Sequence, residues 1–192
     1  MIYVESYGYK GSDEDIIINT TSRSKTWSNG LSPFFLGPVE LYGGYKSLNI
    51  ENAWQYSKVY KQFMDAEGNP SKDYFTWAQG GWNNSYANRY PMGKGVLPEY
   101  SYWNGKKLSY TEARREIYIP LYAKAVHRTL TFKMLQSVIE NNPDKNIYLL
   151  DFDGYNYTKL NMTFDEVIND SKKKMGHAFV LAMLLHGYVN AY

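Results

Sequence analysis

The stretch SLNIENAWQYSKVY, residues 47–60, predicts a helix around which the rest of the fold is arranged. Asn49 is of a type favoured at helix N-caps, and apolar residues recur after it at helical spacing. Glu51 would then lie in the first turn, with Gln55 on the same face and Lys58 one turn further along. One side of this helix would present an acid, an amide and a cation, a combination suited to a binding or catalytic site.

The same pattern has a purely structural interpretation. A glutamate in a first helical turn interacts favourably with the positive end of the helix dipole, by about 0.3 to 1 kcal/mol. A mixed face of glutamate, glutamine and lysine is also common on solvated helices. Spacing alone leaves both interpretations open.

Length and charge limit what the chain can be. Its 192 residues suffice for one domain with a sizeable core. A formal net charge of +2 argues against a general polyanion-binding protein but permits a local basic pocket. No apolar run approaches the roughly 18 residues of a membrane span, and no secretory signal is recognisable. We therefore expect a cytoplasmic protein with no membrane partner.

Composition also bears on cofactors and ligands. The absence of cysteine excludes disulfides, thiolate nucleophiles and cysteine-based metal centres. With only three histidines we expect no metal and no organic cofactor, and we expect His127 to be structural. Aromatic residues make up 17% of the chain, which suits planar ligands such as nucleotides but serves cores and interfaces equally well.

Hydrophobic patterning predicts one mixed α+β domain spanning residues 1–192, with more helix than strand. Short strands are expected near Ile16, Val39 and Ile147. Beyond the first helix, helices are expected from the capping box at Ser109, before and after residue 130, from the capping box at Thr163, and over residues 172–187.

Two features of the middle of the chain carry their own expectations. Pro120 should interrupt the helix that begins after Ser109, because proline lacks the backbone N–H and collides with the preceding turn. Residues 65–109 show no clear periodicity. A loop of this length in a compact domain is usually functional or contains unrecognised short elements.

Residues 51–58, ENAWQYSK, resemble the Glu-His-x-Tyr-Gln-x-x-Lys helix of the NADAR, or YbiA-like, superfamily. Asn52 replaces the family's His, and Trp54 replaces its Tyr. The preceding segment is similar to that family's lead-in to the helix, through Trp27-Ser28-Asn29, Ser32 to Phe35 and the strand from Val39. The match covers Trp27 to Tyr60, and the chain is identified as a divergent member.

This resemblance implies cleavage of an N-glycosidic bond. The family's substrates include ribosylamino-pyrimidines and ADP-ribose attached to guanine, so the partner would be a nucleotide-like or ADP-ribosyl molecule, free or carried on nucleic acid. Such reactions pass through an oxocarbenium-like transition state. Glu51 would either stabilise this cation or activate the attacking water. Gln55 and Lys58 would orient the substrate, and Ser28 and Asn29 would line the pocket, with a simple turn, which Asn29-Gly30 favours, as the alternative for that pair.

Further residues are predicted to contact the substrate. Residues 87–95 loosely resemble the family's Ala-x-Arg-x-x-Gly-Arg segment, with Lys94 in place of the second arginine. Arg89 and Lys94 would hold a phosphate there, although two exposed cations in a turn-rich loop are the alternative. Trp54 or Trp82 would stack on the base.

Carboxylates at the end of a buried strand are the other place to look for chemistry. Asp151 and Asp153 alternate, so only one of them would face a given pocket; an Asx-type turn is the alternative. The Trp-Gly of the family's Asp-x-x-Trp-Gly motif is absent here, and Tyr155 or Tyr157 would take its stacking role. Because Glu51 should stay ionised in a first helical turn, one of these aspartates would act as the acid, facing Glu51 across a cleft.

Two other functions remain open at this point. The first is a binding or inhibitory protein that has lost the chemistry. Three departures from the family pattern fit it: Asn52 in place of His, the missing Trp-Gly, and the absence of the family's arginine from the last helix. A single-stranded nucleic-acid binder that uses Tyr and Trp as stacking platforms is the third interpretation, and the near-neutral charge disfavours it.

Overall fold

The computed structural model describes residues 1–191, which form two compact units. Unit 1 comprises Met1–Ser32 together with the chain from Tyr122 onward, and unit 2 comprises Pro33–Leu121. More residues are helical than extended, and the predicted α+β class is confirmed. The assignment of the whole chain to one domain stays a prediction.

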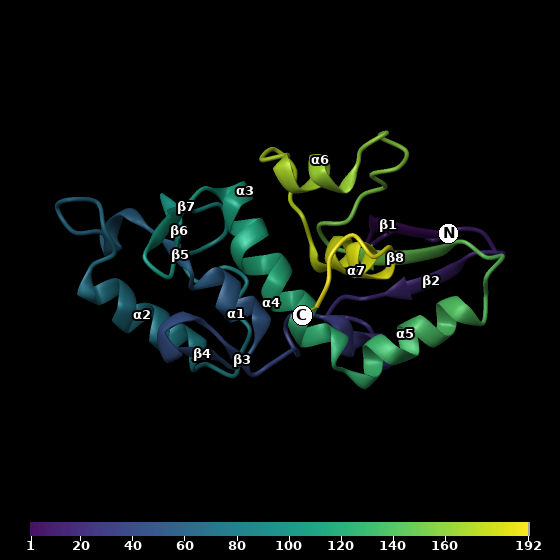
Figure 1. Ribbon diagram of the computed structural model, residues 1–192, viewed down its shortest axis with the longest axis horizontal. Helices are drawn as coiled ribbons and strands as arrows, with labels where there is room; N and C mark the ends of the chain where they lie inside the picture. The colour runs from purple at the N-terminus through teal and green to yellow at the C-terminus, as the bar shows by residue number, and fades with distance from the viewer. Residues whose placement is uncertain (192) are drawn as a thin grey trace. The chain divides into compact units, whose positions relative to one another are not determined.

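Unit 1 is built on a parallel sheet whose central strand is the last of its three strands in sequence. β8 (Ile147–Asp151) lies between β1 (Ile2–Ser6) and β2 (Ile16–Asn19), as Figure 1 shows, and both neighbours run parallel to it. All five residues of β8 are buried, as expected for the middle of a parallel sheet. The strands predicted near Ile16 and Ile147 are therefore confirmed.

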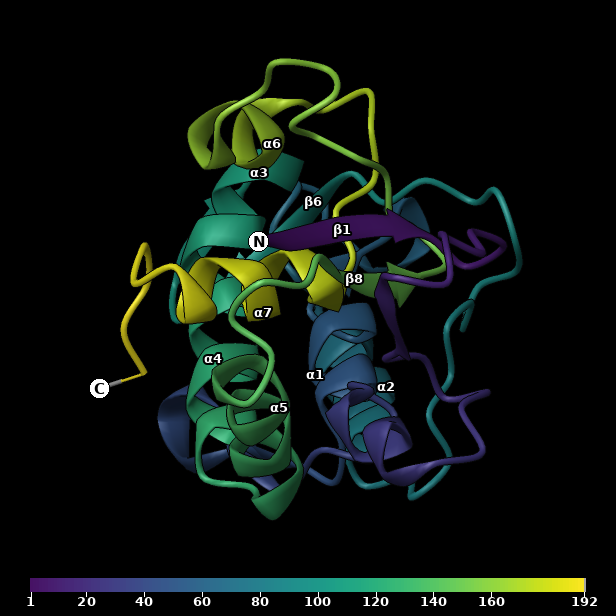
Figure 2. The same ribbon diagram turned by 90° about the vertical axis from the view of Figure 1, so that its right-hand side faces the viewer.

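The helices that lie entirely in unit 1 are α5 (Leu130–Glu140), α6 (Phe164–Asn169) and α7 (His177–Leu185), with a 3-10 turn η1 (Trp27–Leu31), and most of α4 (Ile119–His127) also belongs to this unit. α7 contacts β1 and β8, beside which it lies in Figure 2. Its residues from His177 to Met183 are all buried, so α7 forms the middle of the core of unit 1. α6 begins at the predicted capping box, where Thr163 and Glu166 bond each other's backbone N–H groups.

Unit 2 contains short elements around α1 (Ile50–Gln55) and α2 (Lys72–Trp82), which contact each other. Two antiparallel sheets accompany these helices: β3 (Val39–Glu40) with β4 (Lys46–Ser47), and β5 (Lys58–Val59) with β6 (Tyr100–Trp103) and β7 (Lys106–Leu108). The remaining elements are η2 (Tyr42–Gly44), η3 (Lys61–Phe63), α3 (Tyr110–Ala113) and the π-helical turn η4 (Arg114–Tyr118).

The helix predicted over residues 47–60 is shorter than expected. Its N-cap is confirmed, because the Asn49 side chain accepts a 2.8 Å hydrogen bond from the backbone N–H of Asn52. The helix ends at Gln55, and β5 then pairs with β6. Pairing with a strand over forty residues away overrides the local helical pattern, and Lys58 therefore lies on a strand and not on the helix.

The predicted interruption at Pro120 is wrong. α4 (Ile119–His127) continues directly from η4, with Pro120 in its first turn. In η4 the backbone N–H of Ile119 bonds the carbonyl of Arg114, five residues earlier. A turn widened in this way accommodates a proline ring that an ordinary α-helical turn would exclude.

Residues 65–109 contain elements that the pattern concealed, namely α2, β6 and β7. Glycines at positions 80 and 81 weakened the helical signal of α2. Gly81 is required by packing, since a Cβ there would lie 2.1 Å from the ring of Tyr56. No helix within residues 1–191 combines the length and apolar character needed to cross a bilayer.

Candidate functional site

Glu51, Gln55 and Lys58 form a chain of polar contacts in unit 2. Glu51 lies in the first turn of α1 and is only 6% exposed. Gln55 Nε2 donates to Glu51 Oε1 at 2.9 Å, and Lys58 Nζ donates to Gln55 Oε1 at 2.6 Å. The lysine therefore fixes which way the Gln55 amide is turned, and the amide in turn orients the carboxylate. The acid, amide and cation predicted to share one face do meet.

Aromatic rings and a second cation extend this site. Lys58 Nζ lies 5.0 Å from the ring centroid of Trp54, and the Trp54 ring lies 6.3 Å from that of Tyr110. The second cation, Arg114, lies over the Tyr110 ring, with its guanidinium carbon 4.2 Å from the ring centroid. Trp54 is half-buried, as a stacking residue should be, and it sits beside the cation predicted to orient the substrate.

Arg114 is the residue of this site that the sequence did not reveal. It is 1% exposed and begins the π-helical turn η4, an element found frequently at functional sites. The only sequence signal is its position four residues after Tyr110, which places the two side chains on one helical face. An arginine in a charged run after a capping box is ordinarily solvated, so its burial could not be predicted.

Asn52 has a structural role. Its side chain is fully buried, and Nδ2 lies within hydrogen-bonding distance of the carbonyls of Gly81, Asn84 and Tyr86 at 3.1, 3.0 and 2.8 Å. Its Oδ1 accepts from the backbone N–H of Asn88 at 2.8 Å. This one amide thus anchors the start of the loop that carries Arg89.

Three more of the predicted ligand-binding residues, Trp82, Arg89 and Lys94, belong to unit 2. Trp82 is 1% exposed and its ring packs 5.3 Å from that of Tyr45 in an aromatic core, so the prediction that it stacks on a base is corrected. Arg89 is half-buried with its guanidinium 5.5 Å from the Tyr90 ring, and Lys94 is exposed. A shared phosphate site for Arg89 and Lys94 stays a prediction.

In unit 1, Asp151 is buried in an ion pair and is unsuited to act as the acid. Burial alone would raise its pKa, but the facing His177 ring and the backbone N–H groups of Ala178 and Asp153 lower the pKa to about 2. His177 Nδ1 lies 3.0 Å from Asp151 Oδ2. A general acid needs a raised pKa, so the expected role of Asp151 as proton donor is corrected.

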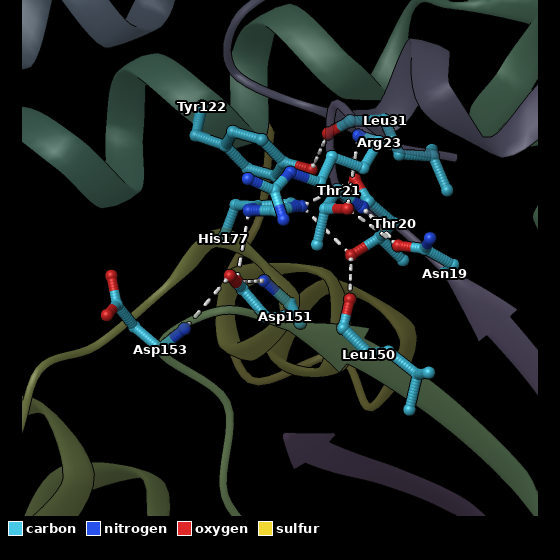
Figure 3. A network of polar contacts seen from close by, with 11 residues as sticks. Asn19, Thr20, Thr21, Arg23, Leu31, Tyr122, Leu150, Asp151, Asp153 and His177 are labelled. Carbon is cyan, nitrogen blue, oxygen red and sulfur yellow. Dashed lines mark hydrogen bonds and ion pairs between the residues drawn. The ribbon is translucent and has the colours of Figure 1, made fainter. Parts of the chain in front are cut away.

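His177 is held on both ring nitrogens. Its Nε2 lies 2.8 Å from the carbonyl oxygen of Thr20, which can only accept, and 2.9 Å from Thr20 Oγ1 (Figure 3). Since Nδ1 faces a carboxylate, both nitrogens carry hydrogen and the ring is an imidazolium. The order Thr, His, Asp resembles a catalytic triad, but Thr20 is 0% exposed and its hydroxyl donates to the Leu150 carbonyl. The network is structural.

Asp153 and Tyr155 follow β8 in the same unit. Asp153 is half-buried, and its backbone N–H donates to Asp151 Oδ1 at 3.3 Å. The strand ends at Asp151, so the two aspartates do not alternate on a continuing strand. The Tyr155 ring packs 4.7 Å from that of Phe179. No ligand-directed role for either residue follows from these contacts.

Ser28 and Asn29 have different environments. Ser28 is buried, donates to the Asn19 carbonyl at 2.6 Å and lies within 3.0 Å of the hydroxyls of Ser24 and Thr26. These hydroxyl residues line a pocket of ≈ 450 Å³ in unit 1, together with apolar residues of β2. Asn29 is exposed.

The predicted site residues are thus divided between the two units. Glu51, Trp54, Gln55 and Lys58 are brought together in unit 2, whereas the aspartates, Tyr155 and the Ser-Asn pair belong to unit 1. A cleft between Glu51 and an aspartate stays a prediction. Within residues 1–191, no three His, Asp or Glu side chains are grouped to hold a metal ion.

Comparison with known proteins places the chain in a family without assigning a function. The profile of a family of unknown function, DUF6939, matches residues 9–181, and the chain belongs to that family. No curated protein and no solved structure gives a significant match. The resemblance to the NADAR superfamily therefore rests on the residues quoted above and stays a prediction.

Proposed function

We propose that this protein is an N-glycosidase that hydrolyses the bond between a ribosyl carbon and a base nitrogen, in a nucleotide-like or ADP-ribosyl substrate. The observation that carries the proposal is the contact chain from Lys58 through Gln55 to Glu51. It supplies an oriented carboxylate in a site with little water, where charge stabilisation is strongest.

Each member of the chain has a role in this reaction. Glu51 stabilises the positive charge that develops as the carbon–nitrogen bond breaks, then accepts a proton from the water that adds to the anomeric carbon. Gln55 holds the carboxylate in one orientation, and Lys58 acts through Gln55 as a positioning residue. Since the pKa of Asp151 is lowered to about 2, the departing base takes its proton from solvent or leaves without one.

The aromatic wall supports a planar leaving group. Trp54 is half-buried beside Lys58, so a base could stack on its ring while the ribosyl carbon faces Glu51. The reaction needs no metal or organic cofactor, and we place the protein in the cytoplasm without a membrane partner.

Replacement of Glu51 tests the proposal. Glu51→Gln keeps the size of the side chain and should lower base release from ADP-ribosylated guanosine or a ribosylamino-pyrimidine by about 10²- to 10⁴-fold. Glu99→Gln is the matched control, because Glu99 is an exposed carboxylate of the same unit, and it should retain wild-type activity. If Glu51→Gln releases base at the wild-type rate, the proposal is wrong.

The environments of Glu51 and Asn52 favour a second candidate, a binding or inhibitory protein that retains the binding site but does not catalyse the reaction. Glu51 is 6% exposed and already hydrogen-bonded, and Asn52 is committed to anchoring a loop. Titration with ADP-ribose, riboflavin precursors and modified guanine, following Trp fluorescence and product together, separates the two. Binding across that panel without product supports the second candidate.

A further inference from the structure

Three side chains gather at the carboxyl edge of the parallel sheet of unit 1, one after each strand. Tyr7 follows β1, Arg23 comes after the end of β2, and Phe152 follows β8. We call them the edge platform. In sheets of parallel strands, ligands bind preferentially outside the carboxyl ends of the strands. None of the three residues takes part in the proposed reaction, whose residues lie in unit 2.

The platform is an exposed aromatic pair capped by a guanidinium. The rings of Tyr7 and Phe152 are 4.8 Å apart at an angle of 34°, and they are 39% and 37% exposed. The Arg23 guanidinium carbon lies 5.3 Å from the Phe152 centroid. Two large aromatic side chains that adjoin at the surface keep apolar area in water, and a planar ligand that stacks on them would remove that area from water.

Arg23 has the chemistry of an anion receptor. Within residues 1–191 no carboxylate forms an ion pair with it, and its backbone N–H is the group that bonds Thr21 Oγ1. The guanidinium lies near the Phe152 ring at the surface, and its planar set of N–H groups can bind a phosphate or carboxylate through two parallel hydrogen bonds.

The buried network holds the segments that carry the platform (Figure 3). Phe152 lies between Asp151 and Asp153, and the Asp153 N–H donates to the Asp151 carboxylate at 3.3 Å. Next to it, Gly154 approaches β1 so closely that a Cβ would lie 2.2 Å from the Glu5 carbonyl oxygen. A position fixed in advance lowers the entropic cost of binding.

The turn that carries Arg23 is fixed in the same way. Thr21 Oγ1 donates to Asn19 Oδ1 at 2.7 Å, and the Arg23 N–H donates to Thr21 Oγ1 at 3.2 Å. The segments that carry Phe152 and Arg23 are therefore each held by a hydrogen bond to the strand that they follow, β8 and β2 respectively.

We propose that the edge platform binds a planar aromatic ring that carries an anionic group, of which a nucleoside monophosphate is the simplest example. The ring stacks on the exposed aromatic pair, and the anion bonds the Arg23 guanidinium. None of the three platform residues belongs to the set assigned to the hydrolysis, so the existence of this site does not depend on the proposed function.

Isothermal titration with AMP, adenosine and inorganic phosphate tests the proposal. AMP should bind saturably, and adenosine and phosphate should each bind at least about 10-fold more weakly, because each lacks one of the two contacts. Arg23→Gln and Phe152→Leu should each weaken AMP binding by about 10-fold. Both residues lie at the surface, and circular dichroism checks that each variant keeps the fold.

Two control variants separate this site from others. Arg128→Gln removes another exposed arginine of unit 1 and should leave AMP affinity unchanged. Lys145→Gln removes an exposed cation at the other end of β8 and should also leave it unchanged. The proposal is overturned if AMP does not bind saturably, if Arg23→Gln binds it as tightly as wild type, or if either adenosine or phosphate binds as tightly as AMP.

Discussion

Gly176 lies so close to Asp151 that a Cβ at residue 176 would be 2.1 Å from Asp151 Oδ2. The glycine is at the N-cap of α7 with φ near −88°, a conformation that any residue adopts. It is therefore the space beside the carboxylate, and not the backbone conformation, that requires glycine here. The Asp151–His177 ion pair forms only because residue 176 has no side chain.

Gly176→Ala should lower the free energy of unfolding by about 2–4 kcal/mol, because the new methyl group displaces the carboxylate from its partners. Urea denaturation followed by circular dichroism measures this. Gly8→Ala is the matched control, since a Cβ there meets nothing within 4 Å, and it should change stability by about 0.5 kcal/mol or less. Equal stability of the two variants would contradict the steric argument.

Asp151 should give the protein an acid-sensitive stability. Its folded pKa of about 2 lies below the ordinary value of 3.8, so the ionised carboxylate stabilises the fold above about pH 4. That contribution, about 2 kcal/mol, is lost as the pH falls from about 4 toward 2. Stability measured across this range should show the loss.

Asp151→Asn tests whether Asp151 causes this loss of stability between pH 4 and 2. The variant leaves the buried His177 ring without its carboxylate and should lose about 3–5 kcal/mol at pH 7, with little further change between pH 4 and 2. Asp144→Asn, at an exposed position of the same unit, should keep the wild-type profile. If both variants lose stability between pH 4 and 2 as the wild type does, other groups cause the loss.

Asn52→Ala should loosen the loop after α2. It removes the amide that bonds the loop carbonyls and the Asn88 N–H, and leaves these backbone groups without that partner, at a cost of about 2–3 kcal/mol. Trypsin should then cut faster after Arg89 and Lys94. Asn83→Ala, at the exposed C-cap of α2, is the control. Cleavage at the wild-type rate would show that other contacts hold the loop.

Arg114→Lys should not be a conservative change. The guanidinium lies over the Tyr110 ring, 4.2 Å from its centroid, in a buried position, and an ammonium group does not reproduce stacking of a planar cation on a ring. We expect a loss of about 2–3 kcal/mol in the free energy of unfolding. Arg115→Lys, the exposed neighbour on the same turn, should lose less than about 0.5 kcal/mol. Similar losses for both variants would mean that stacking contributes little.

Local signals in the sequence predicted the features that depend on a few neighbouring residues. The caps at Asn49, Ser109 and Thr163 each bond a backbone N–H three residues later, and these residue types favour that geometry by themselves. The buried strand at Ile147 is similarly marked by its continuous apolar run. The contact between Glu51 and Gln55 also follows from spacing along one helix.

What the sequence could not supply are contacts between distant residues. His177 meets Thr20 across 157 positions, and nothing in the local sequence of either residue marks the other. The strand at Lys58 depends on its pairing with Ser101, and the burial of Trp82 depends on rings from other elements. Such features decide whether a polar or aromatic residue is structural or available to a ligand.

The order of strands in the sheet of unit 1 has a consequence for synthesis of the chain. β1 and β2 each pair with β8 and not with each other, so neither has a strand partner until residues 147–151 have been made. Unit 2, in contrast, is one continuous segment, Pro33–Leu121. As the chain emerges from the ribosome, unit 2 can fold first, while the two opening strands wait for one encoded more than a hundred residues later.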